Sequence, residues 1–152
     1  MCNCERERCN DRRPIRTCGI CSIQRGIQSI REAITKIERG IRRADEGDFC
    51  GCVRDIEEGI DALQRGARDL REGLNHINRR MRCRERRELE DILCDIDAAI
   101  RDIDRALDVF CGGDISGGLG TIEEVLDDLE EDLEDLQRII QINNCTNNNC
   151  NR

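Results

Sequence analysis

A chain of 152 residues can form one compact domain with its own core but is too short for two ordinary domains. Charged residues make up 38% of it and aromatic residues only 1%, so the core must be aliphatic, and this composition favours helices over sheets. The net charge of −8 is divided unevenly, with +6 on residues 1–87 and −14 on residues 88–152.

The sequence contains no candidate membrane segment. No stretch has the roughly 18 uninterrupted apolar residues of a membrane span, and the first residues lack the apolar core of a signal peptide. We therefore expect a soluble protein that has no membrane partner and does not follow the ordinary secretory route.

Residues 1–19 form a cysteine-rich N-terminal arm in this interpretation. The arm has few apolar side chains, so it can bury little surface, and its order depends on cysteine chemistry. The same holds for the Asn- and Cys-rich tail at 143–152. The segment between them, 20–142, is the predicted folded domain.

Four amphipathic helices are predicted in this domain, at about 20–44, 52–81, 85–111 and 115–142. In the first, isoleucine recurs every seven residues at Ile23, Ile30 and Ile37, and a small residue follows each one three positions later. The second helix repeats this pattern position for position, and the last two repeat it less strictly. The predicted packing positions are Gly26, Ala33, Gly40, Gly59, Gly66, Gly73, Ala99, Ala106 and Gly118.

Glycine inside a helix costs about 1 kcal/mol relative to alanine, so glycines in every seventh position need a compensating reason. Close approach of two helix backbones provides one, because aliphatic side chains of a facing helix fit over the small residues. The sequence therefore predicts an all-α fold, an antiparallel four-helix bundle with close packing along Gly and Ala ridges.

Two of the three connections are evident, at residues 45–48 and 112–114, where glycine and aspartate interrupt the helical pattern. The middle junction, 78–88, has neither glycine nor proline, although the apolar phase slips there. A turn near 79–84 gives the up-down-up-down bundle, which we prefer. The alternative joins the second and third helices into one of about 60 residues, roughly 90 Å long, whose core is completed by other chains.

Cysteine is the residue type most suggestive of function. The 12 cysteines approach the density of a disulfide scaffold. In the bundle, Cys50, Cys52 and Cys111 fall at one end, where three thiols cannot all pair internally, and Cys94 lies on the outward face of its helix. The candidate crosslinking residues are Cys2, Cys4, Cys9, Cys18, Cys21, Cys50, Cys52, Cys83, Cys94, Cys111, Cys145 and Cys150.

Metal binding is the alternative use of these thiols. Cys18 and Cys21 form a C-x-x-C pair, and with Cys2 and Cys4 they could provide a four-thiolate site for zinc or copper. Copper-storing bundles line their interior with cysteines, whereas the interior stripe here is isoleucine and leucine. We therefore expect no cofactor.

No catalytic site is apparent, so we expect the protein not to be an enzyme. The only histidine, His76, flanks the apolar stripe of its helix at the edge of the solvent, and no E-x-x-H motif for a di-iron site is present. The arginine-rich run at 79–87 could contact nucleic acid phosphates. The negative net charge and the lack of stacking aromatic residues argue against this, and the run is better matched to carboxylates of the fourth helix, in the same chain or in the next.

Pairs of cysteines in polar arms, such as Cys2 with Cys4 and Cys145 with Cys150, a charged body and no signal peptide resemble cysteine-rich structural proteins of bacterial spore coats and exosporia. The resemblance implies a layer that is built inside a mother cell and is oxidised after that cell lyses, hence a spore or cell-surface location in an oxidising environment.

The functional expectation is a structural protein that self-assembles with itself as partner into a disulfide-crosslinked sheet or filament. A soluble cysteine-rich metal-binding or storage bundle is the alternative, and a nucleic-acid-binding or adaptor bundle is a third hypothesis.

Overall fold

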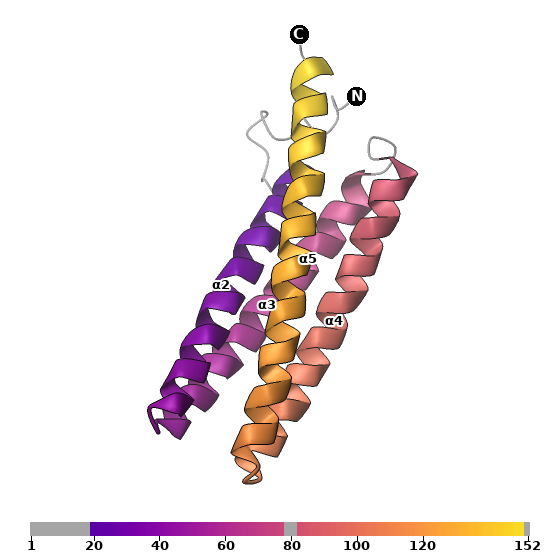
Figure 1. Cartoon of the computed structure of the whole chain (residues 1–152). Coiled ribbons are helices and arrows are strands. Elements are labelled where there is room, and N and C mark those ends of the chain that lie inside the picture. The colour runs from indigo at the N-terminus through magenta and orange to yellow at the C-terminus, as the bar shows by residue number, and fades with distance from the viewer. Residues whose placement is uncertain (1–18, 78–81, 151–152) are drawn as a thin grey trace.

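The computed structural model describes residues 19–77 and 82–150, with side chains as far as residue 141. Four helices account for nearly all of this part of the chain, which contains no strand: α2 (Gly19–Asp45), α3 (Phe49–Ile77), α4 (Cys83–Cys111) and α5 (Ile115–Cys150). Successive helices run antiparallel (Figure 1). The closest contacts join α2 to α3 and α4 to α5, so the bundle consists of two helical hairpins packed against each other.

The predicted antiparallel four-helix bundle is confirmed, and the alternative of one continuous middle helix is wrong. Helix α3 ends at Ile77, and α4 begins at Cys83 and packs back against it. Several helix bounds differ from expectation. Helix α3 spans Phe49–Ile77 instead of 52–81, and α4 begins at Cys83 instead of 85. Helix α5 continues from the predicted end at 142 to Cys150, through most of the segment assigned to the tail. The division into arm, domain and tail stays a prediction.

The turns within the two hairpins have the same structure. Gly47 and Gly113 adopt φ values of +87° and +113°, a backbone region that favours glycine. The next residue in each turn, Asp48 or Asp114, accepts a hydrogen bond from a backbone N–H three residues later, at 2.9 Å in both cases. Each aspartate therefore caps the helix that follows it.

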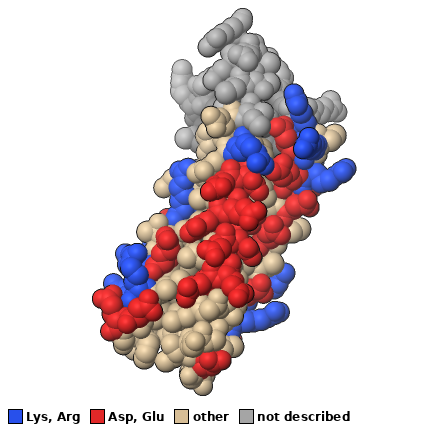
Figure 2. Space-filling view, in the orientation of Figure 1, with Lys and Arg blue, Asp and Glu red and all other residues tan. Residues whose placement is uncertain are grey.

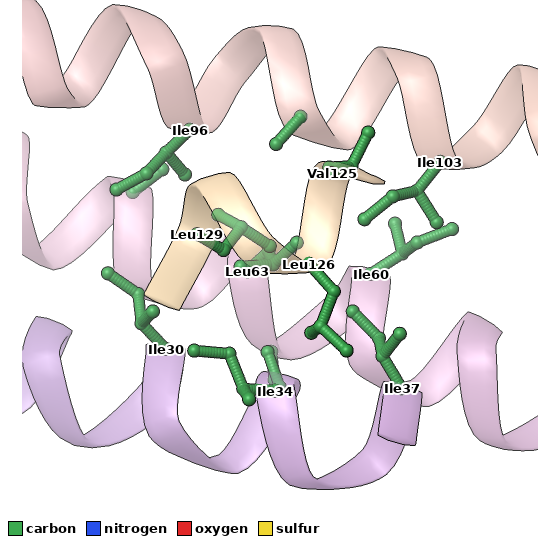
Figure 3. Close-up of a cluster of buried hydrophobic side chains, with 14 of the residues drawn as sticks. Ile30, Ile34, Ile37, Ile60, Leu63, Ile96, Ile103, Val125, Leu126 and Leu129 are labelled. Carbon is green, nitrogen blue, oxygen red and sulfur yellow. The ribbon is translucent and has the colours of Figure 1, made fainter. Parts of the chain in front are cut away.

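The core is aliphatic, as the composition predicted, and all four helices contribute to it (Figure 3). Its largest fully buried side chains are those of the seven-residue pattern. They are Ile23, Ile30, Ile37, Ile56, Leu63, Leu70, Ile77, Leu89, Ile96, Ile103, Ile122 and Leu129.

The small residues of α2 and α3 face one another across a close helix contact. A Cβ atom added to Gly26 would lie 3.0 Å from the carbonyl oxygen of Gly66, and one added to Gly66 would lie 3.1 Å from the carbonyl oxygen of Gly26. At Gly73 the corresponding distance, to the carbonyl oxygen of Gly19, is only 2.7 Å. A side chain at Gly73 would therefore overlap the facing backbone, and one at Gly26 or Gly66 would crowd it.

The second hairpin keeps this close packing only near its turn. Gly118 of α5 packs against α4 at Ala106: a Cβ atom added to Gly118 would lie 2.8 Å from the carbonyl oxygen of Ala106. Further along α5 the equivalent positions are Val125 and Asp132, in place of Gly59 and Gly66 in α3. Val125 and Asp132 are among the residues that line a groove of about 270 Å³ between α4 and α5.

Candidate functional site

Three of the described cysteines, Cys50, Cys52 and Cys111, lie at the end of the bundle that contains the turns at 46–48 and 112–114, which we call the turn end. The rings of Phe49 and Phe110 pack edge to face there, with centroids 5.7 Å apart, and join the start of α3 to the end of α4. The opposite end, where α2 begins and α5 ends, is the terminal end (Figure 1).

The three turn-end thiols have different environments. Cys50 and Cys111 are exposed, whereas Cys52 is 0% exposed and belongs to the core. Burial raises the pKa of Cys52 to about 11, with smaller contributions from Asp55 and Cys111. Cys52 is therefore protonated at neutral pH, and its thiol is not available to another chain.

Burial distinguishes Cys52 from the other candidate crosslinking residues. Because α3 begins at Phe49, Cys52 lies inside the helix, seven residues before Gly59 and on the same ridge. Its backbone lies close to Gly40 of α2, where an added Cβ would be 3.1 Å from the Cys52 carbonyl oxygen. The seven-residue spacing was the signal that could have identified it as a packing residue.

Two further thiols lie on the outer surface of α4. Cys83 is exposed in its first turn, and Cys94 is exposed farther along the helix, on the outward face that its register indicated. Neither thiol, nor that of Cys50, Cys52 or Cys111, forms a disulfide with a described residue. Four exposed thiols are thus distributed over the bundle: Cys50 and Cys111 at the turn end, Cys94 on the side of α4, and Cys83 toward the terminal end.

The other cysteines are only partly accessible to structural description. Cys21 is half-buried, and desolvation raises its pKa. Cys145 and Cys150 belong to the last turns of α5, but their side chains lie outside the described residues, as do Cys2, Cys4, Cys9 and Cys18 entirely. Among the described residues, no group of three potential ligands is arranged to hold a metal ion. The alternative metal set therefore falls mostly outside the described part of the chain.

Exposed hydrophobic side chains lie close to the turn-end thiols, beside the exposed carboxylates of Asp48, Asp108 and Asp114. Phe49 and Val109, which are 42% and 45% exposed, are the exposed large hydrophobic residues among those described. The first two turns of α5 contain no charged residue between Ile115 and Ile122. In Figure 2, much of the lowest part of this face is uncharged, whereas acidic and basic side chains gather at its lower left.

An acidic groove lies between α4 and α5, and sequence reasoning missed it. Burial, and then the nearby Asp95, raises the pKa of Asp132 to about 7. Asp132 occupies a small-residue position of the helix register, equivalent to Gly66, which could have distinguished it from the solvated carboxylates around it. The groove is lined by Asp95, Ala98, Ala99, Asp102, Val125, Asp128, Leu129, Glu131 and Asp132, and acidic side chains form a band along this face in Figure 2.

The arginine-rich run is not neutralised within the described bundle. Arg138 of α5 pairs with Glu88, and Arg71 of α3 pairs with Asp97, but the described arginines of the run form no ion pair with a described residue. These are Arg82, Arg84, Arg86 and Arg87. Residues 79–81 lie outside the described residues.

Fold and thiols together define a helical bundle with an aliphatic core and cysteines on its outer surface. The only histidine, His76, is exposed on α3, as its sequence position at the edge of the apolar stripe predicted.

None of the described helices is long and apolar enough to span a membrane. No protein-family model, curated protein or solved structure matches the chain.

Proposed function

We propose that this chain is a structural protein that assembles with copies of itself into a sheet or filament, in which disulfide bonds join neighbouring chains. The observation that carries the proposal is the set of exposed thiols at Cys50, Cys83, Cys94 and Cys111. They lie on a bundle whose core is complete without them.

Distance excludes some bonds within the bundle. Cys83 and Cys94 are separated by eleven residues of one helix, or about 16 Å at 1.5 Å per residue. A disulfide requires Cα atoms about 4.4–6.8 Å apart, so these two thiols cannot pair with each other in one chain. The outward side of α4 thus offers Cys94 no described thiol within bonding distance, and this favours a partner from another molecule.

The proposed location is a spore or cell-surface layer. The resemblance to spore coat and exosporium proteins supports it, because thiols of such a layer stay reduced during synthesis and are oxidised once the mother cell has lysed. Crosslinks of this kind would make the layer durable, because two linked chains cannot dissociate unless a covalent bond is broken.

The test compares reducing and non-reducing denaturing gels of protein that was assembled under mild oxidation. We expect a ladder of covalent oligomers that collapses to monomer with reductant, and Cys94→Ser should weaken it. Cys52→Ala is the matched control, because its buried thiol takes no part in crosslinking, and it should leave the ladder unchanged. A wild-type chain that runs as a monomer while all its thiols are oxidised or metal-bound would contradict the proposal and favour the metal-binding bundle.

A further inference from the structure

The outer face of α4 carries two thiols and two opposite charges in one line. The line consists of four exposed residues at intervals of four, three and four positions: Cys83, Arg87, Glu90 and Cys94. At about 100° per residue they fall within about 60° of the helix circumference, so they form one stripe, which we call the outer stripe. Buried residues of α4, such as Ile92, lie on the opposite side. The outer stripe therefore faces away from the bundle, on the side that α4 forms in Figure 1.

The order of residues in the outer stripe is self-complementary. A cysteine comes first and last, and the two charges between them are opposite. If a second copy is turned so that the two α4 helices run antiparallel, Cys83 of each copy lies opposite Cys94 of the other. The same register places Arg87 of each copy opposite Glu90 of the other. Such reciprocal contacts are those of a two-fold dimer.

Charged residues beside the outer stripe fit the same register. Arg84 and Asp91 are exposed and lie on one flank of the stripe, so Arg84 of each copy comes near Asp91 of the other. Neither these two residues nor Arg87 and Glu90 form an ion pair with a described residue. Their charges are therefore available to a second copy. A hollow of about 350 Å³ on this flank can receive side chains of that copy, and it is lined by Cys83, Arg84, Arg87, Glu88 and Asp91.

The distance between two packed helices suits a disulfide at these positions. Helix axes in contact are about 8–10 Å apart, and each Cα atom lies about 2.3 Å from its own axis. At the wider spacing, facing Cα atoms are about 5–6 Å apart, within the range of a disulfide. In one chain, by contrast, Cys83 and Cys94 are about 16 Å apart along α4. A disulfide that joins Cys83 to Cys94 can therefore form only between two chains.

We propose that two copies of the chain pair through the outer stripes of their α4 helices, in an antiparallel two-fold contact closed by two disulfides between Cys83 and Cys94. This inference rests on the proposed function and defines one of its contacts. Because α4 runs from the terminal end to the turn end, the turn ends of the two copies point in opposite directions. Cys50 and Cys111 stay exposed at the two far ends of the pair, where they can join it to further pairs.

Each bond needs an oxidant, which we take to be a small-molecule disulfide such as oxidised glutathione. The thiolate of one cysteine attacks this disulfide, forms a mixed disulfide and releases one small thiolate. The thiolate of the facing cysteine then attacks the protein sulfur of the mixed disulfide and releases the second small thiolate. The protons lost by the two protein thiols pass to the two small thiolates. For both bonds of a pair, four protein thiols are oxidised and two small disulfides are reduced to four thiols.

The experiment uses two full-length variants that each reverse one charge of the outer stripe, Arg87→Glu and Glu90→Arg. When either variant pairs with itself, like charges face each other twice, and association should weaken about tenfold. When the two variants are mixed, every reversed charge meets its opposite, so mixed pairs should form as readily as wild-type pairs. Arg105→Glu is the matched control, because it makes the same charge change on α4 at a position that is 76% exposed and lies outside the contact. Circular dichroism should show all variants folded.

The measured quantity is the yield of linked peptides that join Cys83 to Cys94, after limited oxidation with glutathione disulfide and digestion without reduction. We expect a high yield from the wild-type chain and from Arg105→Glu, a yield about tenfold lower from each stripe variant alone, and a restored yield from their equal mixture.

Equal yields from all samples, or a mixture that stays as low as the single variants, would overturn the two-fold contact. So would wild-type protein that is crosslinked through other cysteines but contains no such peptide, and the proposed function would then stand without this contact. A wild-type chain that forms no disulfide between chains would overturn both. Covalent pairs that never grow beyond two chains would support the contact and contradict the sheet or filament.

Discussion

Replacing a ridge glycine by alanine tests the close packing of α2 and α3. In an exposed helix the change stabilises by up to about 1 kcal/mol. At Gly73, however, the new Cβ would lie 2.5 Å from Cγ1 of Ile23 and 2.7 Å from the carbonyl oxygen of Gly19. A backbone oxygen cannot rotate aside, so the two helices must separate, and overpacking of this kind costs about 1–3 kcal/mol. We expect Gly73→Ala to be destabilising.

Gly120 provides the matched control, because it lies in α5 and an added Cβ would meet nothing within 4 Å. We expect Gly120→Ala to raise the melting temperature by roughly 2–4 °C, the shift that about 1 kcal/mol produces in a domain of this size. Gly66→Ala should fall between the two, because its closest new contacts, with Ile30 and Gly26, are 2.9 and 3.1 Å.

The assay is thermal unfolding of the reduced protein, followed by circular dichroism. Gly66→Leu, which adds three more carbon atoms at the same contact, should be more disruptive than Gly66→Ala. If Gly73→Ala raises the melting temperature as much as Gly120→Ala does, the ridges are not in close contact and the explanation of the glycines is wrong.

Three further predictions concern charge and helix capping. Because the pKa of Asp132 is raised to about 7, the folded chain retains a proton that the unfolded chain releases near pH 4, so stability should fall as pH rises between these values. Asp132→Asn should flatten this dependence in urea unfolding, and an unchanged slope would contradict it. Association of the reduced protein, measured by sedimentation, should weaken as salt rises if the arginines at 82–87 dock on the acidic groove of another copy, since exposed charges are screened beyond about 8 Å near physiological ionic strength. Arg84→Glu should have the same effect at low salt, and indifference to both changes would refute such docking. Asp114→Ala removes the hydrogen bond to the N–H of Gly117 and should cost about 1 kcal/mol in thermal unfolding, whereas no loss would exclude a capping role.

The helices and their pairing could be predicted because local pattern and tertiary packing agree in this chain. A seven-residue spacing of isoleucine with glycine specifies both the buried face and the close contact, and the Gly-Asp sequence marks two turns. The start of α3 was placed too late because Asp48 was not recognised as its helix cap. The end of α5 was placed too early because its last residues are Asn-rich, and asparagine is a weak helix former.

The site was harder to predict, since it depends on how the register places individual polar side chains. Cys94 was assigned outward from its heptad position, and it is exposed. Cys52 and Asp132 occupy positions of the seven-residue pattern that are glycines elsewhere in the chain. Because both residues are polar, they were not recognised as packing positions. The pKa of Asp132 could not be anticipated, because it depends on burial and on the nearby Asp95, and both follow from the packing of α4 on α5.

The central claim, that disulfides join different chains, can be tested directly by isotope mixing. Equal amounts of ¹⁴N- and ¹⁵N-labelled protein are mixed under reducing conditions, oxidised into the assembled state and digested without reduction, and the disulfide-linked peptides are analysed by mass spectrometry. Bonds between chains should give peptide pairs that combine both labels for the peptides containing Cys50, Cys94 and Cys111. Linked pairs that carry only a single label would show that the bonds close within one chain, and would contradict the account.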